Sequence, residues 1–137
     1  LDGVKGLFVD KPLALRRFAL YWLPPLFYLA LIFTLSGMSQ PPIPSLVDGN
    51  LLHYPEYAVL AALLLRALAG QKRGSPGWGL LLLAVVLSSA WGALDELHQA
   101  FVPGRVPDPS DWWHDTLGAA AGAGLWALWT LRAKWRR

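Results

Sequence analysis

The sequence contains no cysteine, which excludes disulfide bonds, thiolate catalysis and zinc sites built on cysteine. It also lacks a P-loop, a dinucleotide-binding glycine fingerprint and a serine-centred nucleophile pattern. No internal repeat with a period of roughly 20 to 50 residues and no low-complexity tract is found. What remains for any chemistry is a set of carboxylates, imidazoles and a few guanidinium groups.

Charged residues are also scarce, at 15% of the chain, whereas 55% of residues are hydrophobic and stand in long runs. A membrane-spanning helix needs about 20 mostly apolar residues. We predict four such helices, at 18–35, 51–68, 78–97 and 112–131. With 137 residues and short connections, we expect one domain over 1–137, an all-α integral membrane four-helix bundle.

The first apolar run follows several basic residues, as the apolar core of a secretory signal peptide would. It is longer than such a core, however, and it ends in Leu35-Ser36-Gly37-Met38 without a small-residue cleavage site. We therefore predict a helix that the mature protein retains.

Basic residues are concentrated on one side of the predicted bundle. All but one of the 12 Lys and Arg residues lie before the first run, at the end of the second run or just after it, or at the C-terminus. The positive-inside rule places these segments in the cytoplasm, so the chain is predicted as a multi-pass protein of the cytoplasmic membrane with both termini inside. The basic residues then contact anionic membrane lipids, and no nucleic-acid partner is expected.

The opposite, extracytoplasmic side carries Arg105 and all but two of the 9 carboxylates. Near this side, three of the predicted helices each carry an acid and a histidine three residues apart. The residues are His53, Glu56 and Tyr57 in the second run, Asp95, Glu96, His98 and Gln99 in the third, and Asp111, His114 and Asp115 in the fourth. Positions i, i+3 and i+4 share a helix face, and ionisable groups in a membrane are costly unless they face protein or water. We predict one shared pocket that is open to the exterior.

Gly118 and Gly122 continue the stripe of Asp111 and Asp115 along the fourth helix. Small residues spaced by four positions let a neighbouring helix approach closely. The acidic side chains are therefore predicted at a junction between helices and not in lipid.

Each of these elements also has a purely structural interpretation. Asp48 is typical of a turn and helix N-cap, either Asp108 or Ser110 can cap the fourth helix, and Asp111 lies where the helix dipole favours a negative charge. His114 follows two tryptophans, as an interfacial residue would. An ion pair of Arg105 with the acids at the end of the third helix would simply lock the bundle.

A metal site is a separate possibility. The i, i+3 pairs of acid and histidine have the spacing found in carboxylate-bridged bundle sites. Oxygen and nitrogen ligands without sulfur suit zinc, manganese, magnesium or calcium. The spacing does not fix the distances between helices, so the presence of a divalent metal or any other cofactor stays open.

Four motifs run from the end of the first predicted helix into the fourth. They are Ser36 through Gln40, His53-Tyr54-x-x-Tyr57, Asp95-Glu96-x-His98-Gln99-x-Phe101-x-Pro103-Gly104-Arg105, and Asp111-x-x-x-Asp115-x-x-Gly118-x-x-x-Gly122. Together they resemble the VanZ-like family of bacterial membrane proteins. The resemblance implies a small multi-pass membrane protein, and the family's namesake is associated with low-level resistance to the glycopeptide teicoplanin. Many relatives carry a lysine where this chain has Asn50, so a cation from that position is not expected here.

Glycopeptides bind cell-wall precursors outside the membrane, on the side where the topology places the polar site. We therefore expect the site to handle a lipid-linked wall precursor or another anionic substrate at the outer leaflet, in glycopeptide resistance or envelope metabolism. If a reaction is catalysed, the proton-transfer groups are Asp95, Glu96 and His98. The predicted binding residues are His53, Tyr57, Gln99, Arg105, Asp111 and Asp115, with Arg105 as the anchor for an anion.

The alternative is a non-enzymatic membrane protein that binds a drug, a lipid or a partner, with the acids and Arg105 as a structural lock. A proton-coupled transporter is disfavoured because the inner halves, 60–65 and 122–131, contain no polar relay. The ligand, the oligomeric state and the question of catalysis stay open at this stage.

Overall fold

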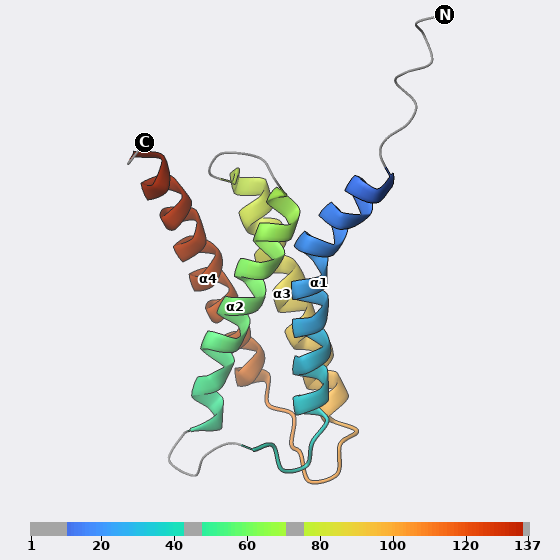
Figure 1. Ribbon diagram of the computed structural model, residues 1–137. Coiled ribbons are helices and arrows are strands. Elements are labelled where there is room, and N and C mark those ends of the chain that lie inside the picture. Colours follow the sequence, from blue (N-terminus) through green and yellow to red (C-terminus); the bar gives the residue numbers. More distant parts are fainter. Residues whose placement is uncertain (1–10, 43–47, 71–75, 136–137) are drawn as a thin grey trace, which may run out of the picture.

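Four α-helices follow one another in the computed structural model, which describes residues 11–42, 48–70 and 76–135. The helices are α1 (Lys11–Ser36), α2 (Gly49–Ala69), α3 (Trp78–Gln99) and α4 (Pro109–Trp135). They alternate in direction, so the start of α1 and the end of α4 lie at the same end of the bundle (Figure 1). The all-α prediction is confirmed for the described residues, and each helix extends beyond its predicted bounds.

Three of the described helices are long and apolar enough to cross a membrane, namely Leu13–Ser36, Gly49–Ala69 and Trp78–Gln99. The predicted fourth span, within α4, is not among them. Charged and polar residues at 111–116 and the Gly- and Ala-rich segment 118–124 reduce its hydropathy. The fourth span and the orientation of the bundle therefore stay predictions.

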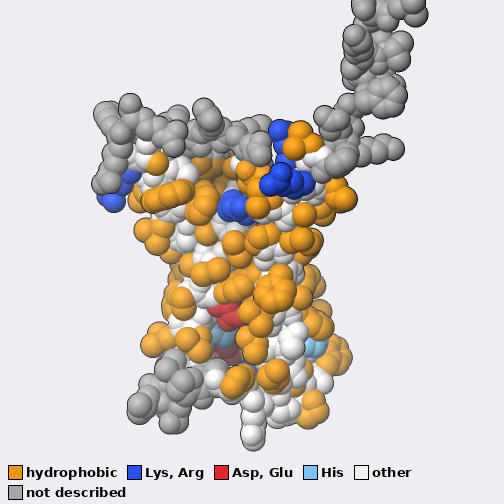
Figure 2. All heavy atoms as spheres, viewed as in Figure 1, with side chains coloured by type: hydrophobic (Ala, Val, Ile, Leu, Met, Phe, Trp, Pro, Cys, Tyr) orange, Lys and Arg blue, Asp and Glu red, His pale blue; other side chains and the backbone are white. Residues whose placement is uncertain are grey.

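The outside of the bundle is largely hydrophobic. Large apolar side chains such as Phe27, Leu82 and Leu125 are 73%, 65% and 66% exposed. On the face shown in Figure 2 they cover the flank, with Lys and Arg side chains near the upper end and Asp, Glu and His in the lower half. An apolar surface this continuous is typical of contact with lipid. Some predicted topology determinants, among them Lys5, Lys72 and Arg73, lie outside the described residues.

The two predicted N-caps are confirmed. Asp48 Oδ1 accepts a hydrogen bond of 3.0 Å from the backbone N–H of Asn50 at the start of α2. Asp108 Oδ1 accepts one of 2.8 Å from the backbone of Ser110, and Pro109 takes the first helical position of α4. This hydrogen bond from Ser110 holds the pKa of the exposed Asp108 carboxyl below its ordinary value.

α1 contains two adjacent prolines, Pro24 and Pro25. Pro24 has no N–H to donate to the carbonyl of Leu20, four residues earlier. Arg66 of α2 supplies the missing donor, because its Nη1 lies 3.1 Å from that carbonyl. Its guanidinium also lies 4.9 Å from the centre of the Tyr21 ring. Arg66, which the sequence marks only as a topology determinant, therefore also ties α2 to α1.

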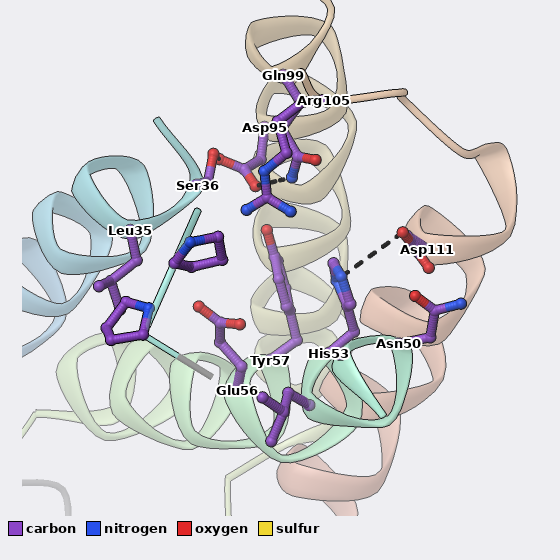
Figure 3. A pocket seen from close by; sticks show the side chains of 14 residues that line it. Leu35, Ser36, Asn50, His53, Glu56, Tyr57, Asp95, Gln99, Arg105 and Asp111 are labelled. Carbon is purple, nitrogen blue, oxygen red and sulfur yellow. Dashed lines mark hydrogen bonds and ion pairs between the residues drawn. The ribbon is translucent and has the colours of Figure 1, made fainter. Parts of the chain in front are cut away.

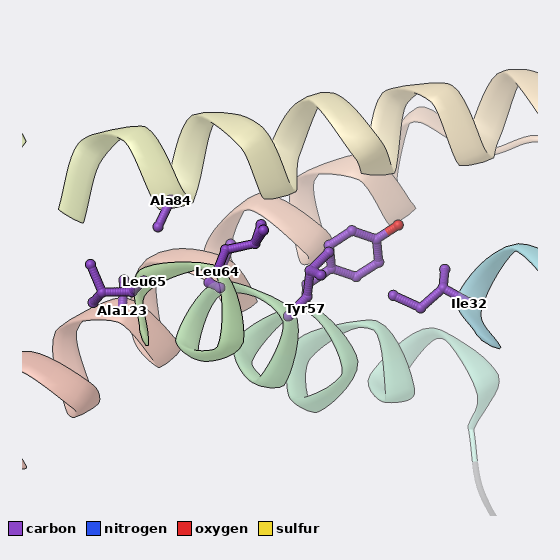
Figure 4. Close-up of a cluster of buried hydrophobic side chains, with 9 residues drawn as sticks. Ile32, Tyr57, Leu64, Leu65, Ala84 and Ala123 are labelled. Carbon is purple, nitrogen blue, oxygen red and sulfur yellow. The ribbon is translucent and has the colours of Figure 1, made fainter. Parts of the chain in front are cut away.

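α2 packs against all three other helices, and α3 packs against α1 and α4 as well. The apolar core between them is shown in Figure 4 and consists of Ile32, Tyr57, Leu60, Ala61, Leu64, Leu65, Ala84, Ala119 and Ala123. Close approach of α4 to α2 depends on the two predicted glycines. A Cβ on Gly118 would overlap the backbone carbonyl of Tyr54, and one on Gly122 would overlap that of Ala58. This contact holds the first half of α4 against α2.

Candidate functional site

A pocket of about 300 Å³ opens at the end of the bundle where α1 and α3 finish and α2 and α4 begin (Figure 3). Its lining comes from all four helices and from the segments that follow α1 and α3. The lining residues are Leu35, Ser36, Pro41, Pro42, Gly49, Asn50, Leu52, His53, Glu56, Tyr57, Asp95, Gln99, Arg105 and Asp111. Acidic and imidazole groups of three helices thus meet at one cavity.

His53 is held from behind by Asp115. Its Nδ1 donates a hydrogen bond of 2.7 Å to Asp115 Oδ1, and its Nε2 lies 3.7 Å from Asp111 Oδ2. Asp115 is 1% exposed and is packed against Gly92, where an added Cβ would come within 2.6 Å of Asp115 Oδ2. A carboxylate on Nδ1 orients the ring and leaves Nε2 to accept or donate a proton. His53 is therefore the pocket residue best placed for proton transfer.

Asp95 lies opposite and joins α1 to α3. Ser36 Oγ donates to Asp95 Oδ1 at 2.6 Å, and Gln99 Nε2 donates to Asp95 Oδ2 at 3.1 Å. All three side chains are buried and line the pocket. The i, i+4 spacing of Asp95 and Gln99 brings them to the same face of α3.

Arg105 reaches the pocket from the segment after α3. Gly104 has a φ of 82°, which glycine adopts without strain, and the turn there precedes the arginine directly. Arg105 Nε donates to the backbone carbonyl of Met38 at 3.2 Å. Within the described residues, every ion pair closer than 4.0 Å involves a histidine, so Arg105 forms none with a carboxylate. The predicted lock between Arg105 and the α3 acids is therefore not formed there.

Glu56 and Tyr57 project from α2 into the same cavity. Tyr57 is 1% exposed, and its hydroxyl has no hydrogen-bond partner among the described residues. In Figure 3 that hydroxyl points toward Asp95 and Arg105, and the half-buried Glu56 carboxylate lies beside the ring. Glu56 likewise makes no hydrogen bond to the part of the chain that is described. In the described part of the chain, neither group has a protein partner that would compete with a ligand.

Two residues of the predicted proton-transfer set lie elsewhere. Glu96 Oε2 accepts a hydrogen bond of 2.9 Å from the backbone of Asp108, and Glu96 borders a separate hollow beside Trp112. His98 stacks on Phe33 of α1, with ring centres 4.2 Å apart. Neither side chain lines the pocket. Of the three predicted groups, only Asp95 does so, because a rotation of 100° per residue turns Glu96 to one side and His98 to the other.

The acid and histidine pairs do not converge on one metal-binding group. His114 lies against Tyr54, with ring centres 4.8 Å apart, and its Nδ1 is 3.5 Å from Asp111 Oδ1. His98 is likewise turned toward an aromatic ring. In residues 11–42, 48–70 and 76–135, no three or more His, Asp and Glu side chains are arranged to hold a metal ion.

Reasoning from the sequence assigns no role to three of the pocket's polar residues, Ser36, Asn50 and Glu56, although Glu56 is among the side chains predicted to share the pocket. Ser36 ends the first apolar run, and only its membership in the first motif marks it. Glu56 shares a helix face with His53, and this spacing is a sufficient signal to include it. The predicted residues His53, Tyr57, Gln99, Arg105 and Asp111 all line the pocket, and Asp115 lies directly behind His53.

Fold and pocket together define a class: a small all-helical protein, with three helices long and apolar enough to cross a membrane and with a buried group of acids and an imidazole at one end. A sequence model of the VanZ/LLP1 family matches residues 21–130, and the chain belongs to this family. The matched region contains every residue of the pocket. No curated protein and no solved structure matches the chain.

Proposed function

We propose that the chain is a protein of the cytoplasmic membrane whose pocket binds the head group of a lipid-linked anionic molecule, such as a cell-wall precursor, at the outer leaflet. The distribution of charge supports this orientation. Arg16, Arg17 and Arg132 lie exposed at the end of the bundle opposite to the pocket. By the positive-inside rule that end is cytoplasmic, and the pocket is then extracytoplasmic.

The observation that carries the proposal is that Arg105 lines the pocket without a carboxylate partner among the described residues. Its Nε is fixed on the carbonyl of Met38. Two parallel N–H donors on a rigid fork suit a phosphate or carboxylate group. Arg105 is thus the anchor for the anionic part of the ligand.

The size of the pocket selects the kind of ligand. Its volume of about 300 Å³ is at the lower end of the range of roughly 300–1,000 Å³ that small-molecule sites occupy. A head group fits this space, whereas a whole glycopeptide does not. A role in teicoplanin resistance, which the family resemblance implies, would then act through the precursor and not through capture of the drug.

The hydrogen bond between His53 and Asp115 adds the capacity for acid and base catalysis. With Nδ1 held by the carboxylate, Nε2 faces the pocket and can take a proton from a bound group or from water. If the protein is an enzyme, His53 transfers the proton and Asp115 positions it.

A second candidate function is a purely structural one, in which the polar groups only hold the helices together. Two contacts favour it: Ser36 with Asp95 joins α1 to α3, and His53 with Asp115 joins α2 to α4. In that case, removal of these groups lowers stability without affecting any ligand. It does not explain the terminal nitrogens of Arg105 or the Tyr57 hydroxyl, for which the described residues provide no hydrogen-bond partner.

Binding to the purified protein in lipid nanodiscs tests the proposal, with a fluorescent polyprenyl diphosphate as the probe. We expect Arg105→Gln to weaken binding at least about tenfold, because a charge-assisted hydrogen bond contributes roughly 1.5–3 kcal/mol. Arg132→Gln, at the opposite end, is the matched control and should bind as the wild type does. Absence of binding by the wild type, or equal binding by both variants, would contradict the proposal.

The structural candidate makes a different prediction. Asp115→Asn should then lower the unfolding temperature while teicoplanin susceptibility of a bacterium expressing the chain stays that of the wild type. Under our proposal, Arg105→Gln changes susceptibility, while its unfolding temperature in detergent falls only slightly because of the lost hydrogen bond to Met38.

A further inference from the structure

The pocket contains more negative than positive groups. Three carboxylates line it, those of Glu56, Asp95 and Asp111, against the single guanidinium of Arg105. The imidazole of His53 is already bonded to a fourth carboxylate, that of Asp115. A ligand that carried only negative charge would be attracted by Arg105 and repelled by the carboxylates, so it would bind less tightly than a ligand that also carries a positive charge.

The acceptors in the pocket are not all used by the protein. Asp95 receives two hydrogen bonds, from Ser36 and Gln99. Glu56 receives none from the described residues, and the buried hydroxyl of Tyr57 is also without a partner there. Figure 3 shows the Tyr57 hydroxyl pointing toward Asp95 and the Arg105 guanidinium, which lie near each other in this view, with the Glu56 carboxylate beside the Tyr57 ring.

We propose that the ligand of this pocket is zwitterionic: its primary ammonium group binds between Glu56, Asp95 and the Tyr57 hydroxyl, and its anionic group binds Arg105. This inference rests on the proposed function and specifies the ligand class of the same site. An ammonium group has three donors, which match the two carboxylates and the hydroxyl oxygen. The positive charge of the ligand then offsets the excess of carboxylates.

A primary ammonium fits this pocket better than a quaternary one. Quaternary ammonium groups cannot donate hydrogen bonds and are typically bound by the faces of several aromatic rings. Tyr57 is the single Phe, Tyr or Trp among the described residues that line the cavity, whereas several acceptor oxygens surround the cavity. A head group such as phosphoethanolamine, or the amine of a lipid-linked peptide, has the required chemistry.

Competition for the polyprenyl diphosphate probe in nanodiscs tests the inference, with EDTA present to exclude bridging by a metal ion. The competitors are phosphatidylethanolamine, phosphatidylcholine, phosphatidylglycerol and soluble phosphoethanolamine. We expect phosphatidylethanolamine to compete at least about tenfold better than the other two lipids. Competition by soluble phosphoethanolamine would show that the head group is sufficient, and its failure would show that the lipid tail is required.

Substitution of Glu56 gives the sharper result, because the two kinds of ligand should respond in opposite directions. Glu56→Gln is expected to weaken the binding of phosphatidylethanolamine about tenfold. The affinity for the diphosphate probe should stay the same or increase. Tyr57→Phe, which keeps the ring, should weaken the amine ligand as well. The control is Asp48→Asn, which removes an exposed acid at the same end and keeps a good N-cap.

Two results would overturn the inference while the proposed function stands. One is equal competition by the three lipids. The other is a Glu56→Gln protein that loses the diphosphate and the amine ligand to the same extent. If the wild type does not bind the diphosphate probe at all, the proposed function fails and the inference fails with it.

Discussion

Two arginines, one in each half of the bundle, perform the same local task with different parts of the side chain. Arg66 of α2 donates to the carbonyl of Leu20, within α1, and Arg105 donates to the carbonyl of Met38, just after α1. Arg66 uses the terminal Nη1, and the guanidinium also lies over the ring of Tyr21. Arg105 uses Nε, so that the two terminal nitrogens of its fork stay available in the pocket.

We infer from these contacts that Arg66 is a structural residue and that Arg105 is a ligand-binding one. Arg66 compensates for a hydrogen bond that Pro24 cannot make, so its partner is part of the fold. Arg105 lies among carboxylates without pairing with one in the described chain, so its terminal nitrogens lack a structural partner there. Between the two lies the apolar core that includes Leu60, Leu64 and Leu65.

The largest effect is expected where the two halves are joined, at the close contact of α2 and α4. Gly122→Ala would place a Cβ onto the backbone carbonyl of Ala58, so the helices must separate. We expect a loss of about 2–3 kcal/mol in unfolding free energy, measured by thermal or denaturant unfolding in detergent, together with weaker ligand binding. Gly124→Ala, where an added Cβ contacts nothing within 4 Å, should be neutral. Equal stability of the two variants would refute the close contact.

Arg66→Leu should separate stability from binding. It leaves the carbonyl of Leu20 without a donor and removes the contact with Tyr21, so we expect a loss of about 1–2 kcal/mol in unfolding free energy. Ligand affinity in nanodiscs should stay that of the wild type.

A second substitution tests the cause of that loss. Pro24→Ala restores an N–H that can donate to the carbonyl of Leu20, so Pro24→Ala in the Arg66→Leu background should recover part of the lost stability. A double-mutant cycle over the two positions measures the coupling. Strictly additive effects would mean that Arg66 does not compensate for the proline.

The helices and several local features were predictable because they depend on short stretches of sequence. Apolar runs located all four helices, and the preference of aspartate for N-caps identified Asp48 and Asp108. The spacing of Gly118 and Gly122 correctly indicated a close helix contact. His53 and Asp115 could be predicted in one region because both lie within the first two turns of helices that begin at the same end of the bundle.

The remaining features depend on how far each helix is rotated about its axis, which no local pattern fixes. A modest rotation decides whether His98 faces the pocket or Phe33, and the structure shows the latter. The hydrogen bond between Ser36 and Asp95 joins residues 59 positions apart, and its existence follows only from the packing of α1 on α3. The second role of Arg66 likewise required the position of Leu20 in space.

Arg105→Lys tests whether the pocket requires the guanidinium group of Arg105 or only its positive charge. A lysine has one nitrogen at the end of its chain, so it cannot hold the carbonyl of Met38 and contact a ligand with separate groups. We expect the affinity for the diphosphate probe to fall about tenfold and the unfolding free energy to change by less than about 1 kcal/mol. A lysine variant that binds as tightly as the wild type would show that only the charge matters, and the argument from the free fork would be wrong.

The smallest effects are expected at the two predicted proton-transfer residues that lie outside the pocket. Glu96→Gln keeps an oxygen that can accept the hydrogen bond from Asp108, and His98→Leu keeps an apolar contact with Phe33. Each should change ligand affinity by less than about twofold, whereas Asp95→Asn, within the pocket, should weaken an amine ligand about tenfold. Isothermal titration of the three variants in nanodiscs with soluble phosphoethanolamine makes the comparison. If Glu96→Gln or His98→Leu weakened binding as strongly as Asp95→Asn does, the site would extend beyond the cavity. The set of Asp95, Glu96 and His98 that the sequence predicts would then describe the site better than the lining of the pocket does.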